Sequence, residues 1–193
     1  AGQLFEIDVR LRPNGDAGLL VSSLAAFRQY QLEAAWLWEH QALTRARFSA
    51  GDPAIGAVFE DIRSEVLRQP RNLDTLRAEV LAMRRRMLHA HATPADQAAT
   101  VFDLKQDRGG LIDVEFIVQY LVLGHAHQYP QLTANLGNIA LLKMAAELNL
   151  IPAALAETVR DAYRDYRRMQ HLARLNNAKA HVAPAQVVER VAA

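Results

Sequence analysis

Residues 4–12, LFEIDVRLR, alternate strictly between apolar and charged side chains, with Phe5, Ile7, Val9 and Leu11 on the apolar side. A period of two is typical of a strand that packs one face on a core. The Pro13-Asn14-Gly15-Asp16 run that follows predicts a turn. Because one strand cannot form a sheet, its partners must come from elsewhere, and the rest of the chain decides the fold.

From about Ser22 onward, apolar residues recur every three or four positions, the spacing of amphipathic helices. Capping residues and breaks mark where these helices begin: Ser22 or Ser23, Asp52-Pro53, Asn72, Gly109-Gly110 and Pro152. One helix is expected to run from Ser22 or Ser23 toward Tyr30, and three others are expected to begin at Pro53, Leu73 and Pro152. Four more are expected over residues 34–47, 111–125, 135–148 and 186–191. The expected buried stripes are Ile55, Val58, Phe59, Ile62 and Val66 on one helix, and Leu155, Val159, Ala162, Tyr166, Met169 and Ala173 on another. Long helices with short connections predict a mainly α fold, a helical bundle over 22–193, preceded by a short β segment in 1–21.

Composition sets limits on function. The 193 residues include 22 basic and 21 acidic side chains and no cysteine. A net charge of +1 does not favour bulk binding to nucleic acid or to an anionic membrane. The absence of cysteine excludes disulfides and fits a reducing cytoplasm. No apolar run reaches the roughly 18 residues of a membrane span. The chain opens with Ala1-Gly2, and we expect it to be part of a longer protein.

The alternating segment carries the first candidate site. Asp8, Arg10 and Arg12 would project from one strand face as a carboxylate and two guanidinium groups. A carboxylate is a hard oxygen ligand suited to Mg²⁺, and arginine forks match phosphate oxygens. Phosphoryl or nucleotidyl transfer needs these groups. A solvated strand face with ordinary ion pairs is the alternative explanation.

The segment WLWEHQALTRAR carries the second candidate site. Arg45 and Arg47 are candidates to reach nucleotide phosphates, whereas an exposed helix with ion pairs is the ordinary explanation of this spacing. Trp36, Leu43 and Ala46 are expected to face the core.

The third candidate is FDLKQDRGGLIDVEFIVQYLVL. Gly109-Gly110 permits positive φ or close backbone approach, and the helix that follows would offer free amide groups to an anion, assisted by Lys105. That helix is apolar nearly all round, so it should be buried. Asp113 and Glu115 then need partners, and the ordinary explanation pairs Asp113 with the helix dipole and Glu115 with an arginine of a neighbouring helix.

Other charged groups are weaker candidates. His89 and His91, like His125 and His127, are two residues apart, whereas helical metal pairs are usually three or four apart. We expect these histidines at the surface or at an interface. The run Arg84-Arg85-Arg86 is expected on a solvated face.

Three stretches in this order resemble the glutamine synthetase adenylyltransferase family. They are FEIDVRLRPNGDAGLLVSSLAAFRQYQ, AAWLWEHQALTRARFSAGD and FDLKQDRGGLIDVEFIVQYLVLGHAH, and the likeness covers nearly the whole chain. The family's enzyme has two related halves, of which the N-terminal half removes AMP from glutamine synthetase and the C-terminal half attaches it. AWLWEHQAL, with Asp113 in GGLIDVEF, looks like the adenylylating half.

The resemblance implies a Mg²⁺-dependent transfer of AMP from ATP to a tyrosine of glutamine synthetase. Asp8 matches the third carboxylate of the family's metal site, after a Gly-Ser turn and a DxD pair. It would bind metal and help orient or deprotonate the acceptor hydroxyl. Arg10 and Arg12 would neutralise triphosphate charge. The part from about Ser22 resembles the helical companion domain shared with PII-uridylyltransferases, which would form one wall of the nucleotide cleft. Arg45, Arg47 and Lys105 are candidates there from charge and position alone.

The departure from the family pattern is as informative. No Gly-Ser turn and DxD pair precede Asp8, so we expect this chain alone to be inactive as an adenylyltransferase. The resemblance implies glutamine synthetase and the PII signal protein as partners, and a cytoplasmic location. Two other readings stay open. One is a non-catalytic helical module that binds glutamine synthetase or PII, and the other is the deadenylylating half.

Overall fold

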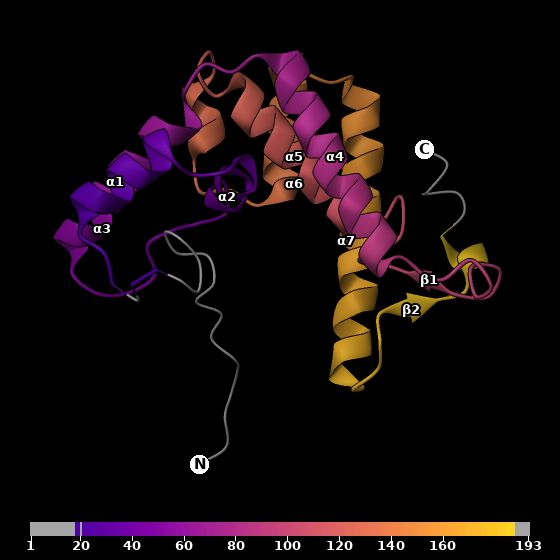
Figure 1. The fold of residues 1–193 in the computed structure, drawn as a ribbon. Coiled ribbons are helices and arrows are strands. Elements are labelled where there is room, and N and C mark those ends of the chain that lie inside the picture. Colours follow the sequence, from indigo (N-terminus) through magenta and orange to yellow (C-terminus); the bar gives the residue numbers. More distant parts are fainter. Residues whose placement is uncertain (1–17, 20, 188–193) are drawn as a thin grey trace.

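A computed structural model of the chain describes residues 18, 19 and 21–187, and they form a mainly helical bundle (Figure 1). The helices of this part are α1 (Leu24–Glu33), α2 (Leu37–Leu43), α3 (Pro53–Leu67), α4 (Leu73–His91), α5 (Leu111–His125), α6 (Asn138–Glu147) and α7 (Ala153–Leu175). Two short 3-10 helices, η2 (Pro130–Thr133) and η3 (Pro184–Gln186), and two short strands, β1 (Phe102–Asp103) and β2 (His181–Val182), complete it. The mainly α class is confirmed.

Local capping explains where the first long helices begin. The Ser23 hydroxyl accepts a hydrogen bond from the Ala26 amide at 3.2 Å, and the Asp52 carboxylate accepts one from the Ala54 amide at 2.8 Å. The Asn72 side chain accepts one from the Thr75 amide at 2.9 Å. Each bond satisfies an amide that the first helical turn would otherwise leave without a partner. All three predicted starts are confirmed.

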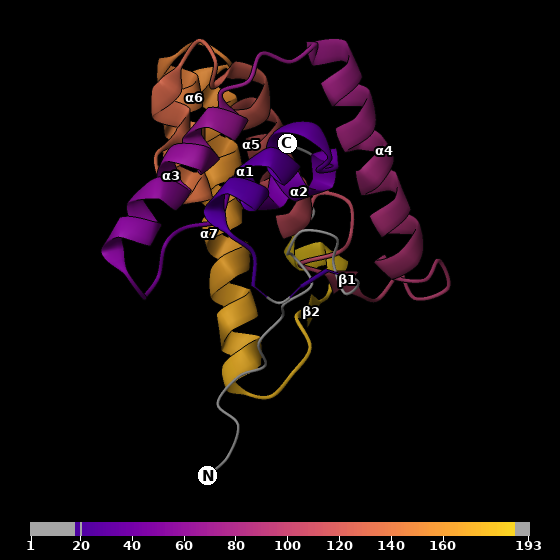
Figure 2. The same cartoon turned by 60° about the vertical axis from the view of Figure 1, so that its left-hand side comes forward.

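Helix α5 lies between two hydrophobic clusters, which explains its nearly uniform apolar sequence. Val114, Val118 and Val122 face the cluster formed with α6 and α7, whereas Leu123 belongs to the cluster formed with α2, α3 and α4. A helix that packs against two clusters needs apolar side chains on more than one side. Figure 1 shows α1 and α3 side by side at one end of the molecule, and Figure 2 shows α4 at the edge of the bundle, where it contacts α5.

Several residues expected in the core are exposed instead. Trp36 was expected to face the core but is 70% exposed, because it precedes the short α2 instead of lying within a longer helix. The helix expected over 34–47 is therefore shorter than predicted. Ile55 and Val58 begin the predicted stripe of α3 but are exposed, and only its second half, with Ile62 and Val66, is fully buried. Leu155 is likewise exposed, so the predicted α7 stripe is also buried only in part.

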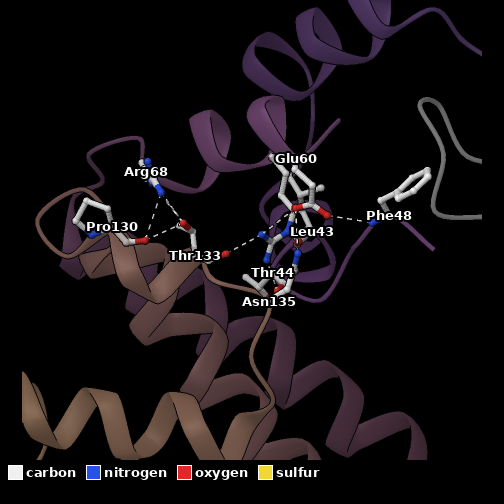
Figure 3. A network of polar contacts seen from close by, with 9 residues as sticks. Leu43, Thr44, Phe48, Glu60, Arg68, Pro130, Thr133 and Asn135 are labelled. Atoms are coloured by element: carbon white, nitrogen blue, oxygen red, sulfur yellow. Dashed lines mark hydrogen bonds and ion pairs between the residues drawn. The ribbon is translucent and has the colours of Figure 1, made fainter. Parts of the chain in front are cut away.

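A buried arginine joins three segments of the bundle. Arg63 of α3 is 1% exposed and donates hydrogen bonds to the carbonyls of Leu43 (3.0 Å), Thr44 (2.8 Å) and Thr133 (2.7 Å). These carbonyls belong to the end of α2 and to η2 (Figure 3). Nearby, Arg68 donates to the Thr133 hydroxyl at 3.0 Å. Because a charged donor satisfies three buried acceptors, this contact fixes the end of α2 against α3 and η2.

The two strands form one small antiparallel sheet, in which Phe102 pairs with Val182 and Asp103 with His181. The strand predicted over 4–12 lies outside the described residues, and so does most of the helix predicted over 186–191. None of the helices in the described ranges is long and apolar enough to cross a membrane.

Candidate functional site

The structure places the predicted site residues unevenly. Asp8, Arg10 and Arg12 lie outside the described residues, so their roles stay predictions. Arg45 and Arg47 follow the end of α2, and both are exposed. Lys105 is exposed in the loop between β1 and α5, and its backbone amide donates to the Asp103 carboxylate at 2.8 Å. Among the described residues, no hydrogen bond or ion pair joins Lys105 to Arg45.

Arg45, in the turn after α2, ends a chain of hydrogen bonds that crosses the three helices α6, α7 and α5. Its guanidinium donates to the Asn138 side-chain oxygen at 2.9 Å, and the Asn138 amide donates to the Tyr163 hydroxyl at 3.0 Å. That hydroxyl donates to the Glu115 carboxylate at 3.4 Å. We call Arg45, Asn138, Tyr163 and Glu115 the polar seam. It starts at the surface after α2 and passes α6 and α7 to reach α5.

The interior of the seam is well shielded from water. Asn138 is 3% exposed and Tyr163 is 7% exposed. Burial raises the pKa of the Tyr163 hydroxyl, and the negative charge of Glu115 raises it further. The hydroxyl therefore stays protonated at neutral pH and acts as a donor to Glu115. The Tyr163 hydroxyl thereby links Asn138 to Glu115.

A second contact strengthens the junction of α2 with α5. The Gln41 amide donates to the Gln119 side-chain oxygen at 2.9 Å. Gln119 lies one helical turn after Glu115, so both polar groups of α5 share one face. The sequence reasoning singled out Glu115 but did not identify Asn138, Tyr163 or this pair. The sequence does contain a signal for Asn138, because this polar residue stands between Gly137 and the apolar run of the helix, where it can reach a polar partner.

The loop before α5 is closed, so the backbone amides that were expected to be free for an anion are not free, whereas the role of Lys105 stays a prediction. The amides of Leu111 and Ile112 donate to the carbonyls of Leu104 (2.9 Å) and Lys105 (3.2 Å). The first turn of α5 therefore already has acceptors within the chain. Gly109 has a φ of +85°, and a Cβ on Gly110 would lie 2.8 Å from the Leu104 oxygen. The two glycines shape a tight loop instead of an open cradle.

Asp113 lies in the first turn of α5, as expected for a carboxylate that meets the helix dipole, but the pairing with an arginine differs from the expectation. Asp113, not Glu115, pairs with an arginine of a neighbouring helix, Arg84 of α4, and also accepts a hydrogen bond from the Gly109 amide. Arg84 is buried, so its expected place on a solvated face is wrong, whereas Arg85 and Arg86 are exposed as expected. Arg84 lies on the side of α4 that meets α5, and the other two do not.

The described residues offer recognition chemistry. Arg45 can bind an anion at the surface, and the buried part of the seam fixes its direction. Within the described ranges, no group of three or more histidine or acidic side chains is arranged to hold a metal ion. The predicted ligand Asp8 is outside those ranges.

Comparison with known proteins agrees with the resemblance seen in the sequence. Residues 1–62 match the family model described as glutamate-ammonia ligase adenylyltransferase, and residues 74–193 match the model described as GlnD PII-uridylyltransferase.

Three curated relatives are named bifunctional glutamine synthetase adenylyltransferase/adenylyl-removing enzyme. The chain is 65% identical to the one from Aromatoleum aromaticum over 97% of its own length and 20% of the relative's. It is 60% identical to the one from Nitrosomonas europaea over 91% of the chain and 18% of the relative. It is also 60% identical to the relative from Chromobacterium violaceum, over 93% of the chain and 19% of the relative. The chain thus spans about a fifth of the length of these relatives.

Proposed function

Because this chain belongs to the glutamine synthetase adenylyltransferase family, we propose that it is part of an enzyme that transfers AMP from ATP to a tyrosine of glutamine synthetase. The names of the relatives, which carry both adenylylating and adenylyl-removing activities, support this proposal. We assign the chain to the adenylylating half on the AWLWEHQAL and GGLIDVEF segments.

The proposed reaction needs groups from both parts of the chain. Asp8 would bind Mg²⁺, which supplies charge neutralisation at the phosphates of ATP when bound. Arg10 and Arg12 would bind the same phosphates from the strand face. Because the Gly-Ser turn and the DxD pair are not in this sequence, the chain by itself is proposed to be inactive.

In the helical part, the polar seam is proposed to form one wall of the nucleotide cleft. The observation that carries this step is the position of Arg45, an exposed guanidinium held by a buried network. Four of its five N–H donors have no partner among the described residues, so they are free to bind phosphate oxygens. Arg47 and Lys105 are proposed as further contacts that raise the positive potential.

Substituting Arg45 in the full-length enzyme tests the nucleotide role. Loss of one charge-assisted hydrogen bond costs about 1.5–3 kcal/mol, so Arg45→Ala should raise the KM for ATP roughly 10- to 150-fold. Arg85→Ala, which removes an exposed arginine of α4, is the matched control and should leave the KM unchanged. An unchanged KM in Arg45→Ala would exclude Arg45 from the cleft.

A second test separates the two halves of the family. Asp8→Asn in the full-length enzyme should abolish AMP attachment to glutamine synthetase and leave AMP removal intact. Loss of removal alone would assign the chain to the deadenylylating half instead.

The exposed apolar residues favour a second candidate, a module that binds glutamine synthetase or the PII protein. Trp36 is 70% exposed and Leu172 is 63% exposed, so both apolar side chains are available to contact a protein partner. If they contact a protein partner, Trp36→Ser or Leu172→Ser in the full-length enzyme should raise the KM for glutamine synthetase or weaken PII binding. The KM for ATP should not change. If neither the KM for glutamine synthetase nor the binding of PII changes, the result would count against this candidate.

A further inference from the structure

The Asn138 side chain is held by hydrogen bonds at both of its ends. Its oxygen accepts from Arg45 at 2.9 Å, and its nitrogen donates to the Tyr163 hydroxyl at 3.0 Å. Asn138 is the first residue of α6, after Gly137, and it is 3% exposed. The helix fixes its backbone and burial fixes its side chain, so the oxygen that meets Arg45 has one position.

The polar seam has a single direction from cation to carboxylate. Arg45 donates to Asn138, Asn138 donates to Tyr163, and Tyr163 donates to Glu115. Reversing the Asn138 amide would place its NH₂ group against the guanidinium and its oxygen against the Tyr163 hydroxyl. The charges at the two ends therefore favour the observed orientation, and consecutive bonds polarise one another.

Arg45 needs such a support because its backbone lies outside regular structure. Helix α2 ends at Leu43, and Arg45 follows in a turn at the surface. A free arginine there would sample many rotamers and lose that entropy on binding an anion. A guanidinium already held in place loses less, so it binds more tightly.

We propose that Asn138 is a positioning residue that orients the Arg45 guanidinium toward the phosphates of the nucleoside triphosphate. This role rests on the proposed nucleotide contact of Arg45. Asn138 is buried and does not touch the nucleotide. It acts by holding one nitrogen of the guanidinium, and the remaining donors stay available to the phosphates.

A double-mutant cycle in the full-length enzyme tests this role, with the KM for ATP and kcat measured during AMP transfer. Asn138→Ala should raise the KM about fivefold with little change in kcat, because ground-state binding is lost. In an Arg45→Ala background, Asn138→Ala should have no further effect, since it acts only through Arg45. Asn138→Asp keeps an acceptor for Arg45 and should stay close to the unchanged enzyme.

The matched control is Asn135→Ala. Asn135 lies three residues earlier and contacts Glu60 at the surface, so its removal should not change the KM for ATP. A thermal melt of each variant accompanies the kinetics. If Asn138→Ala does not fold, Asn138→Ser, whose hydroxyl is too short to reach Arg45, replaces it in the cycle, alone and with Arg45→Ala.

The outcomes distinguish the inference from the proposed function. If Asn138→Ala raises the KM by the same factor with and without Arg45, or does not raise it at all, the positioning role is wrong while the nucleotide contact of Arg45 stands. If Arg45→Ala itself leaves the KM unchanged, the proposed contact is wrong and the positioning role is excluded with it.

Discussion

Arg63 provides the sharpest test of what holds the bundle together. Replacing it with methionine keeps a side chain of similar length to the aliphatic stem of arginine. It removes the guanidinium that joins the end of α2 to α3 and η2. The carbonyls of Leu43, Thr44 and Thr133 then lose their donor inside the protein. Glu60, whose carboxylate lies 3.6 Å from the guanidinium, also loses a positive neighbour.

The expected loss of stability follows from these three acceptors. A buried polar group without a partner costs about 1–3 kcal/mol, which gives an upper sum of roughly 9 kcal/mol. Removing a buried charge returns part of that sum, because its desolvation is no longer needed. Burial already lowers the pKa of Arg63, as expected for a guanidinium that is costly to bury. We therefore expect a net loss of about 3–5 kcal/mol on Arg63→Met.

Thermal and urea unfolding of the 193-residue chain measure this loss. For a protein of this size, each kcal/mol lowers Tm by about 2–4 °C, so the expected fall is roughly 6–20 °C. Arg28→Met is the matched control, because Arg28 pairs with Glu65 at the surface and its side chain is 51% exposed. We expect little change in that variant. If both variants melt alike, the three carbonyl contacts do not stabilise the fold as reasoned.

Two further predictions concern the start of α5, and a third concerns the pKa of His40. Gly110→Ala should cost about 1–3 kcal/mol in urea unfolding, because its Cβ would lie 2.8 Å from a backbone oxygen, whereas Gly137→Ala, with nothing within 4 Å, should be nearly neutral. Asp113→Ala should cost about 2–4 kcal/mol, because it leaves the buried Arg84 without its carboxylate, and Asp113→Asn should cost less.

Burial lowers the pKa of His40 below its ordinary 6.5, against the opposing effect of its bond to the Gln31 carbonyl. The unfolded state then binds more protons, so the chain should lose stability as pH falls through about 6.5. The urea midpoints of unfolding at about pH 7.5 and about pH 5.5 should differ less in His40→Gln than in the unsubstituted chain. An equal difference in the two proteins would contradict this explanation.

Much of the fold could be predicted because its signals are local. Ser23, Asp52 and Asn72 cap helices through bonds to amides two or three residues away, so the sequence alone places those starts. The nearly uniform apolar pattern of residues 111–125 indicated a buried helix, and α5 spans that range. The sequence also carries the family resemblance, which the two family models confirm.

The pairing of charged and polar side chains was decided by tertiary structure. Arg84 meets Asp113 from 29 positions away, and Arg45 meets Asn138 from 93 positions away. Such contacts depend on which faces of α4, α5 and α6 meet, and helical periodicity gives a face but not its neighbour. For the same reason the sequence could not show that Trp36 is exposed or that Arg63 is buried. The chain itself determined its helices, and the packing of those helices determined which charges became structural and which stayed available for a ligand.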